Sequence, residues 1–309
     1  MYEIKREILD SFCLAQNPLA AERDYIECNI LNQIFQFPYF CNNFVFTGGG
    51  TISKIYHMGN RINQDLDLAC FDFKEVAPTR SVGQLGKFKN RFRNYVFTEL
   101  KEKFETSLHD FGKFQIITDK QWRTDNPGMS QHSTSTLHIQ YGSMINPKLK
   151  DIISIEFIPR HYSSDKIKYN SVVPYSIQES EISTKIPNIK FEQTFWDKIY
   201  ALYSINKNGV SRDGLSRHFY DVVHIVPYVV LEETQDMFWD TVAYQNLYTT
   251  KNLDTGKKIS DLAIVPDENK SQVLEQDYSA NKDQYMTPIV PWEYIMLGTN
   301  QLQQKIRGL

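Results

Sequence analysis

Three consecutive glycines, Gly48 to Gly50, stand between a β-prone run at residues 44–47 and a segment of helical character at residues 51–56. Without a Cβ, a glycine backbone can turn sharply and approach a ligand closely. The order of strand, glycine turn and helix also leaves free N–H groups at the helix start, where an anion such as phosphate can bind. A Walker A loop needs Gly directly before its Lys, and Ser53 stands there instead, which disfavours a P-loop NTPase.

Hydrophobic periodicity predicts an α/β (α+β) chain of two domains. In the first half, helical and β-prone segments alternate as in a mixed sheet, and the second half has helical spacing. We expect a mixed-sheet α/β domain at residues 1–187 and a mainly helical domain at residues 188–309, with the boundary near Pro187. Helices are predicted at residues 21–37, 84–104, 191–205 and 214–230, and strands at residues 44–47, 66–71, 114–118, 135–141 and 152–158.

The charge balance excludes a globally basic nucleic-acid binder. The 309 residues carry 34 basic and 37 acidic side chains, so any nucleic-acid surface must be local. The one candidate is the predicted helix at residues 84–104, whose cations lie between aromatic residues. The cations of this helix either form an ordinary charged face toward solvent above a phenylalanine core, or bind RNA or another polyanion and direct it to the active site. Its cations are Lys87, Lys89, Arg91, Arg93, Lys101 and Lys103.

Cysteine spacing and hydropathy indicate the compartment. The four cysteines form no CxxC pair, which excludes a zinc ribbon and a thioredoxin-type redox motif. The first 16 residues are too charged for a signal peptide, and 18 consecutive apolar residues occur nowhere. We therefore expect a cytoplasmic protein without a membrane partner.

Three acids are the strongest candidates for chemistry. Asp65 and Asp67 lie two apart on a predicted strand, so their carboxylates project from one face. Two adjacent like charges need a cation, and Mg²⁺ prefers carboxylate and phosphate oxygens. Glu156 is the candidate for a third acid, because it lies in a predicted buried strand where an unpaired carboxylate is costly. The alternative for Glu156 is an acid facing water.

Several ordered motifs resemble the AbiEii/AbiGii-type toxins, a branch of the DNA polymerase β-like nucleotidyltransferases. Residues 49–54, GGTISK, and residues 60–68, NRINQDLDL, resemble the family's GGTxLxK and RxSxDhDh signatures. Residues 192–198, EQTFWDK, are similar to its RTFWEK block, and residues 216–221, SRHFYD, to its RHYYD block. The chain departs from the family pattern at Asn63, Gln64 and Asp197, where the family has Ser, Glu and Glu.

The resemblance implies a catalytic and nucleotide-binding set spread over both domains. Metal ligands would be Asp65, Asp67 and Glu156, with Lys198 and Asp221 contacting nucleotide phosphates or supporting the active site. The cleft between the domains would be that site, holding an NTP with two Mg²⁺ ions, or Mn²⁺ in their place. The residues implied for nucleotide binding are Gly49, Gly50, Thr51, Lys54, Arg61, Lys198, Arg217 and His218.

The expected reaction is transfer of a nucleoside monophosphate from an NTP to an acceptor hydroxyl. The family resemblance implies RNA, such as tRNA, as acceptor, and a toxin role beside a cognate antitoxin protein; neither follows from the residues themselves. Two alternatives stay open at this point. One is a nucleotide hydrolase or kinase using the same metal site, and the other is a nucleotide- or partner-binding module whose catalysis has decayed.

Overall fold

The computed structural model divides the chain into two compact units, which we describe separately. The first unit comprises Met1–His57 and Ile62–Ile189, and the second comprises Met58–Arg61 and Lys190–Leu309. The short segment Met58–Arg61 thus belongs to the second unit, although it lies between the glycine turn and Asp65 in the sequence. The structure describes residues 7–8, 10–11, 17–59, 61–63, 65–73, 81–109, 114–126, 134–174, 184–211, 213–248, 258–285 and 288–309.

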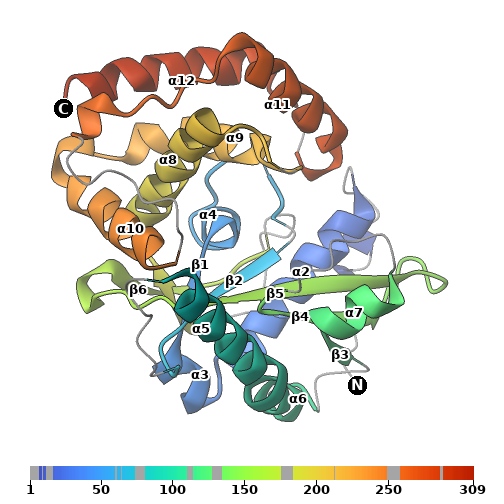
Figure 1. The fold of residues 1–309 in the computed structure, drawn as a ribbon. Coiled ribbons are helices and arrows are strands. Elements are labelled where there is room, and N and C mark those ends of the chain that lie inside the picture. The colour runs from blue at the N-terminus through green and yellow to red at the C-terminus, as the bar shows by residue number, and fades with distance from the viewer. Residues whose placement is uncertain are drawn as a thin grey trace. The chain divides into compact units, whose positions relative to one another are not determined.

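One mixed sheet organises the first unit (Figure 1). The seven strands that the structure describes lie side by side in the order β3-β4-β5-β2-β1-β7-β6. β2 runs parallel to β5 and β1 runs parallel to β7, whereas the other neighbours are antiparallel. The predicted α/β class is therefore confirmed. The strands are β1 (Phe44–Thr47), β2 (Asp65–Cys70), β3 (Gln115–Thr118), β4 (Thr136–Gly142), β5 (Lys150–Ile158), β6 (Ile167–Ser171) and β7 (Lys185–Ile189).

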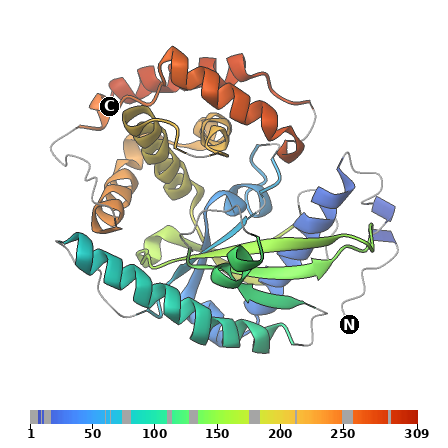
Figure 2. The ribbon, with the colours of Figure 1, turned by 45° about the vertical axis from the view of Figure 1, so that its right-hand side comes forward.

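Helices cover one face of this sheet and build the main core. α2 (Pro18–Ile34) contributes Ile30 and Ile34, and a helical run contributes Phe92 and Phe104. That run consists of α5 (Val82–Tyr95), the π-helical segment Val96–Leu100 and α6 (Lys101–Ser107). It forms one long rod beside the strands (Figure 2). Alternate residues of β2 and β5, among them Leu66 and Ile155, point into this core. The remaining short helices of the unit are α3 (Pro38–Asn43), α4 (Gly49–Lys54), α7 (Asp119–Asp125) and the 3-10 turn Ser164–Lys166.

The amphipathic character predicted for residues 84–104 is confirmed. Phe88 and Phe92 of α5 are buried, whereas Lys87, Lys89 and Arg91 are exposed. The helix thus has a phenylalanine face toward the core and a basic face toward solvent.

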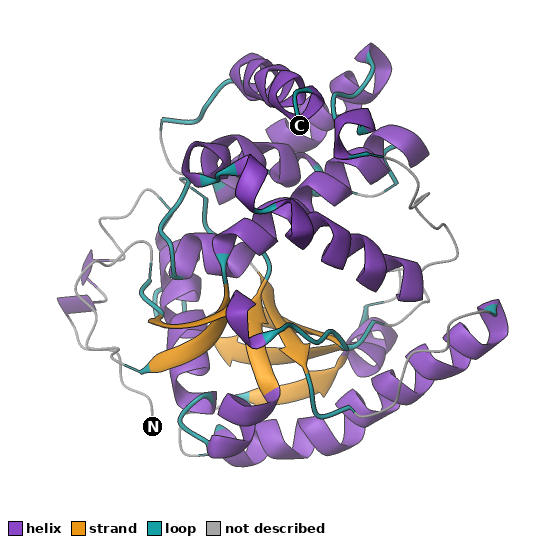
Figure 3. Cartoon of the chain, turned by 90° about the vertical axis from the view of Figure 1, so that its left-hand side faces the viewer, coloured by secondary structure: helices purple, strands orange, loops and turns teal. Residues whose placement is uncertain are grey.

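The second unit is helical, with no strand among its described elements (Figure 3). α9 packs against α8, α11 and α12, and α10 packs against α8. Buried side chains such as Trp196, Phe219 and Ile295 fill the core. The α-helices are α8 (Phe191–Asn208), α9 (Ser216–Ile225), α10 (Gln235–Tyr248), α11 (Glu268–Ala280) and α12 (Trp292–Arg307), and the 3-10 turns are Val226–Tyr228, Leu231–Glu233, Ile259–Asp261 and Lys282–Gln284.

Two strands were not predicted. β6 reads IKYNS and has only two apolar residues, Ile167 and Tyr169. β7 reads KIPNI and contains Pro187, a residue that argues against a strand in sequence patterns. Pro187 therefore lies inside a strand, opposite Tyr169 of β6, and does not end the sheet. The second unit resumes at Lys190.

Two further sequence expectations concern cysteines and membranes. Cys28, Cys41 and Cys70 are free thiols, and Cys13 lies outside the described residues. In the part of the chain that the structure describes, every helix is too short or too polar to cross a bilayer.

Candidate active site

Three acids lie on the sheet face opposite the main core, which we call the acid face. Asp65 and Asp67 alternate along β2 with the buried Leu66 and Leu68. β5 runs parallel to β2 and places Glu156 directly beside Asp67. Residues paired in register on neighbouring strands point to the same side of a sheet, so all three carboxylates share the acid face.

The exposure of Glu156 differs from the sequence prediction. Asp65 and Asp67 are half-buried, but Glu156 is exposed, so the expectation of a buried acid is wrong. The two neighbours of Glu156 on β5, Ile155 and Phe157, are buried and point to the core on the other side of the sheet. Among the described residues, no three His, Cys, Asp or Glu side chains already lie close enough to hold a metal ion.

The glycine turn lies against the acid face. Gly48 has φ 72°, a backbone conformation that residues with a Cβ rarely adopt. A Cβ at Gly48 would lie 1.9 Å from Oδ2 of Asp67, so only glycine fits here. The turn thus begins one residue before the predicted pair: Gly49 and Gly50 form the first turn of α4. The Thr51 hydroxyl donates a hydrogen bond of 2.8 Å to the Gly48 carbonyl, and Thr51 is fully buried.

Asn63 occupies a position where the family motif has a hydroxyl. Its side-chain amide is buried and donates a hydrogen bond to the backbone carbonyl of Asp65. Asn63 therefore supports the start of β2. Gln64, the other departure in this motif, lies outside the described residues.

Lys54 is placed where it cannot contact a nucleotide without a rearrangement. Its ammonium is fully buried and forms ion pairs with Asp24 and with Glu27, the latter at 2.7 Å. Burial would lower the pKa of Lys54, but the two carboxylates outweigh it and raise the pKa above its usual value. Burial raises the pKa of Glu27 to about 7, against the effect of Lys54. In this structure Lys54 thus joins α4 to α2, and its expected role in nucleotide binding stays a prediction.

A second buried ion-pair group lies within the second unit. Arg61 donates from Nε and Nη2 to the two carboxylate oxygens of Asp221, at 3.0 and 2.9 Å. Lys198 of α8 also donates to Asp221, at 2.6 Å. Burial would raise the pKa of Asp221, but the two cations hold it well below its usual range. All three side chains are buried, so they brace α8, α9 and the segment Met58–Arg61.

Two further nucleotide-binding candidates lie on α9. Arg217 and His218 are half-buried and lie four and three residues before Asp221, about one helical turn away. Burial is the main cause that lowers the pKa of Lys198. The charges of Arg61 and Arg217 also lower it. Among the candidates of the second unit, these two side chains are less buried than Arg61, Lys198 and Asp221.

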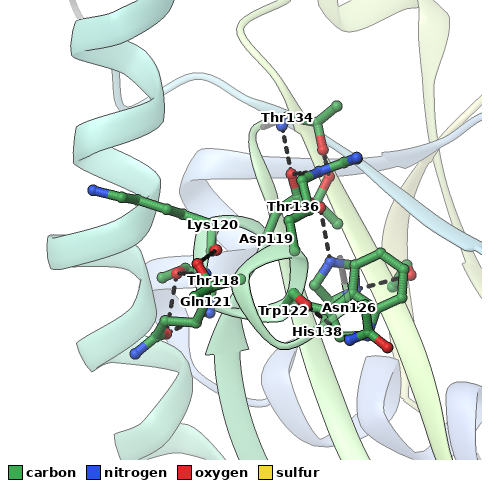
Figure 4. A network of polar contacts seen from close by, with 12 residues as sticks. Thr118, Asp119, Lys120, Gln121, Trp122, Asn126, Thr134, Thr136 and His138 are labelled. Carbon is green, nitrogen blue, oxygen red and sulfur yellow. Dashed lines mark hydrogen bonds and ion pairs between the residues drawn. The ribbon is translucent and has the colours of Figure 1, made fainter. Parts of the chain in front are cut away.

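A polar network on the acid face was not predicted. His138 of β4 pairs in register with Ser154 of β5, and Ser154 pairs with Asp65 of β2. The imidazole contacts the Ser154 hydroxyl through Nδ1 and Asp119 of α7 through Nε2, both at 3.1 Å. Figure 4 shows Asp119 between His138 and Thr134. These residues form no recognisable sequence motif: strand register brings His138 and Ser154 together, and α7 supplies Asp119.

The comparisons with known proteins decide the family. The family model described as "Nucleotidyl transferase AbiEii toxin, Type IV TA system" matches residues 29–295. The chain belongs to the AbiEii family. The match extends past Asp221, the last residue of the recognised sequence motifs, over most of the helical unit. The AbiEii family consists of nucleotidyltransferase toxins, which confirms the resemblance inferred from the motifs.

A solved structure supports the fold of this AbiEii-family chain. MenT4, a nucleotidyltransferase toxin from Mycobacterium tuberculosis H37Rv, is similar with a TM-score of 0.59 and 16% sequence identity. The similarity covers 99% of this chain and 91% of MenT4. No curated protein matches the sequence significantly.

Proposed function

We propose that the acid face is the active site of a Mg²⁺-dependent nucleotidyltransferase. The observation that carries this proposal is the strand register that aligns Asp65, Asp67 and Glu156 beside the Gly48 turn. In the reaction, an acceptor oxygen attacks the α-phosphorus of an NTP and loses its proton. The bond from that phosphorus to the pyrophosphate oxygen breaks, and pyrophosphate leaves.

The chemistry of the three acids suits Mg²⁺. All three offer carboxylate oxygens, which Mg²⁺ prefers over nitrogen or sulfur ligands. In the part of the chain that the structure describes, no three such side chains are already grouped to hold a metal ion, so we propose that the carboxylates rotate toward one another on binding. When bound, Mg²⁺ or Mn²⁺ would neutralise negative charge on the phosphates and on the displaced pyrophosphate.

We divide the expected nucleotide-binding residues into two groups according to their burial and their partners. Gly49 and Gly50 offer backbone at the turn, and Arg217 and His218 are half-buried polar side chains, so we retain these four for nucleotide contact. The others already have buried partners and are proposed to support the fold around the site. This second group is Thr51, Lys54, Arg61, Lys198 and Asp221.

For the acceptor we propose RNA, such as tRNA. Its support is the family membership together with the basic outer face of α5, which offers cations for phosphate contact. Membership of a toxin family also supports a toxin role with a cognate antitoxin protein as partner. A cytoplasmic location is consistent with this partnership.

The test is label transfer from each α-³²P-labelled NTP in the presence of Mg²⁺ and total cellular RNA. Asp67→Ala is the test variant, and Glu102→Gln, which changes an exposed acid on α6, is the matched control. We expect label on RNA with one NTP, lost in Asp67→Ala and retained in Glu102→Gln. Release of labelled nucleotide without any labelled macromolecule would favour the hydrolase alternative. Equal transfer by Asp67→Ala and wild type would contradict the proposed site.

A further inference from the structure

A chain of polar contacts runs along the acid face from α7 over β4 to β5. Asp119 contacts His138, His138 contacts Ser154, and Ser154 is the in-register neighbour of Asp65. Asp119 is 1% exposed and His138 is 5% exposed, whereas Ser154 is half-buried. The chain therefore connects a buried carboxylate to a hydroxyl at the candidate site.

The hydrogen-bond partners of Asp119 fix its charge state. Its Oδ2 accepts hydrogen bonds of 2.7 Å from Nε of Arg123 and from the backbone N–H of Thr134. Burial would raise the pKa of Asp119, but His138, Arg123 and Thr134 outweigh it and lower the pKa to about 2. Asp119 is therefore ionised near neutral pH, and an ionised carboxylate can only accept hydrogen bonds.

The tautomer of His138 follows from this. Because Asp119 only accepts, Nε2 of His138 must carry the hydrogen that joins them. When the ring is neutral, Nδ1 carries no hydrogen and acts as an acceptor. The hydroxyl of Ser154 is then the donor in its 3.1 Å contact with Nδ1. The indole of Trp122 packs on the imidazole, with ring centroids 4.8 Å apart, and restrains its orientation.

Once its hydrogen is committed to His138, Ser154 can only accept further hydrogen bonds. Its in-register neighbour Asp65, and Glu156 two residues along the same strand, are also acceptors when ionised. A group that fits beside these oxygens must supply a cation or a hydrogen-bond donor, such as a hydroxyl. The proposed reaction brings such a hydroxyl to the acid face, namely that of the acceptor.

We propose that Ser154 orients the incoming acceptor hydroxyl by accepting its hydrogen bond. His138 and Asp119 are positioning residues, which keep Ser154 Oγ available as an acceptor beside Asp65. The ligand class is an alcohol, such as a ribose hydroxyl. This inference rests on the proposed nucleotidyl transfer and adds the residue that aligns its second substrate.

The first arm of the test needs no activity. Nitrogen chemical shifts of ¹⁵N-histidine-labelled full-length protein report the tautomer of His138, whose signals are assigned by their loss in His138→Asn. We expect the Nε2–H tautomer in wild type. Asp119→Asn removes the charge that selects this tautomer, and we expect a shift toward Nδ1–H. The Nδ1–H form in wild type would overturn the proposal, because Ser154 would then be free to act as a donor.

The second arm separates acceptor binding from NTP binding. Loss of one neutral hydrogen bond by Ser154→Ala should lower kcat/KM for the acceptor about 5- to 10-fold. NTP affinity, measured by calorimetry, should stay within about twofold. His138→Asn keeps an acceptor oxygen near the position of Nδ1 and should retain more activity than His138→Ala. Thermal melts of each variant exclude loss of folding as the cause.

The outcomes distinguish this inference from the proposed function. If Asp67→Ala abolishes transfer while Ser154→Ala leaves acceptor kinetics unchanged, the role of Ser154 is wrong and nucleotidyl transfer stands. If wild type transfers no nucleotide to any acceptor tested, the proposed function fails and the role of Ser154 fails with it.

Discussion

The backbone of Gly48 lies directly against the carboxylate of Asp67. A Cβ at Gly48 would be 1.9 Å from Oδ2 of Asp67, and the backbone there has φ 72°. The close approach couples the shape of the turn to the position of an acid that we propose to bind metal. Any side chain at position 48 must displace either the backbone of the turn or the carboxylate of Asp67.

Gly48→Ala should therefore damage both stability and the site. We expect a loss of about 1–3 kcal/mol in the free energy of unfolding, from backbone strain at positive φ. Mg²⁺-dependent nucleotide binding should fall at least about tenfold, since Asp67 must move. Urea denaturation and calorimetry measure the two effects. Gly83→Ala on α5, with open space around its Cβ, is the control and should leave both unchanged or slightly improve stability.

Neutralising either acid of β2 should weaken metal-dependent binding. Asp65→Asn and Asp67→Asn each remove a charge with little change of shape. We expect nucleotide binding by each variant to depend less on Mg²⁺, whereas Glu102→Gln should behave as wild type. Calorimetric titrations with and without Mg²⁺ test this. Unchanged metal dependence in both variants would show that the ligands lie elsewhere.

Lys54→Met tests whether this lysine supports the fold or binds nucleotide. The substitution leaves Asp24 and Glu27 buried without their cation, which should cost about 3–5 kcal/mol of unfolding free energy. Adding Asp24→Asn should recover part of the loss, because one buried charge is then removed. Urea denaturation is the measurement. Normal stability combined with lost nucleotide affinity would instead support a phosphate contact.

The ionised Asp119 should make the free energy of unfolding depend on pH at acid pH. Its pKa is about 2 in the folded protein, against the ordinary value of 3.8, so folding favours the ionised form. Its contribution is therefore complete above about pH 4 to 5 and is lost as the pH falls from about 4 to 2. The stability difference between wild type and Asp119→Asn should be constant near neutrality and shrink in this window. Melting curves between pH 6 and 2 would show it, and a difference independent of pH would contradict an ionised Asp119.

The basic face of α5 makes a separate prediction about the acceptor. Neutralising Lys89, Arg91 and Arg93 together should lower RNA affinity and reduce the dependence of log Kd on log salt by about 2 to 3. Binding isotherms at several salt concentrations give this slope. The control neutralises three cations elsewhere in the first unit, the exposed Lys148, Lys150 and Lys185. Equal slopes for the two triple variants would make α5 an ordinary solvated helix.

The sequence predicted most of the fold because most elements carry a clear period. β1 was predicted with the bounds that the structure shows, and the shared face of Asp65 and Asp67 follows from alternation along one strand. β7 could not be predicted, because Pro187 is a strand breaker in local patterns and only its neighbours β1 and β6 make a strand there.

The shared face of the acids could be predicted from the sequence, but the partners of the cations could not. The expected role of Lys54 as a phosphate ligand stays a prediction, and its partner Asp24 lies 30 residues earlier on another helix, where no local pattern reveals it. The contact between Ser154 and His138 could not be predicted from the sequence for a similar reason. Their importance depends on strand register, and no local pattern encodes which residues of β4 and β5 stand side by side.

The pairing of Arg61 with Asp221 constrains how such a chain can be divided or recombined. Arg61 lies in the motif at residues 60–68 but belongs to the helical unit, where Asp221 accepts hydrogen bonds from both Arg61 and Lys198. A fragment ending at residue 189 would leave this guanidinium without its carboxylate, and a fragment starting at residue 190 would lack the guanidinium. A viable exchange of helical units between relatives would therefore have to carry residues 58–61 along with the C-terminal half.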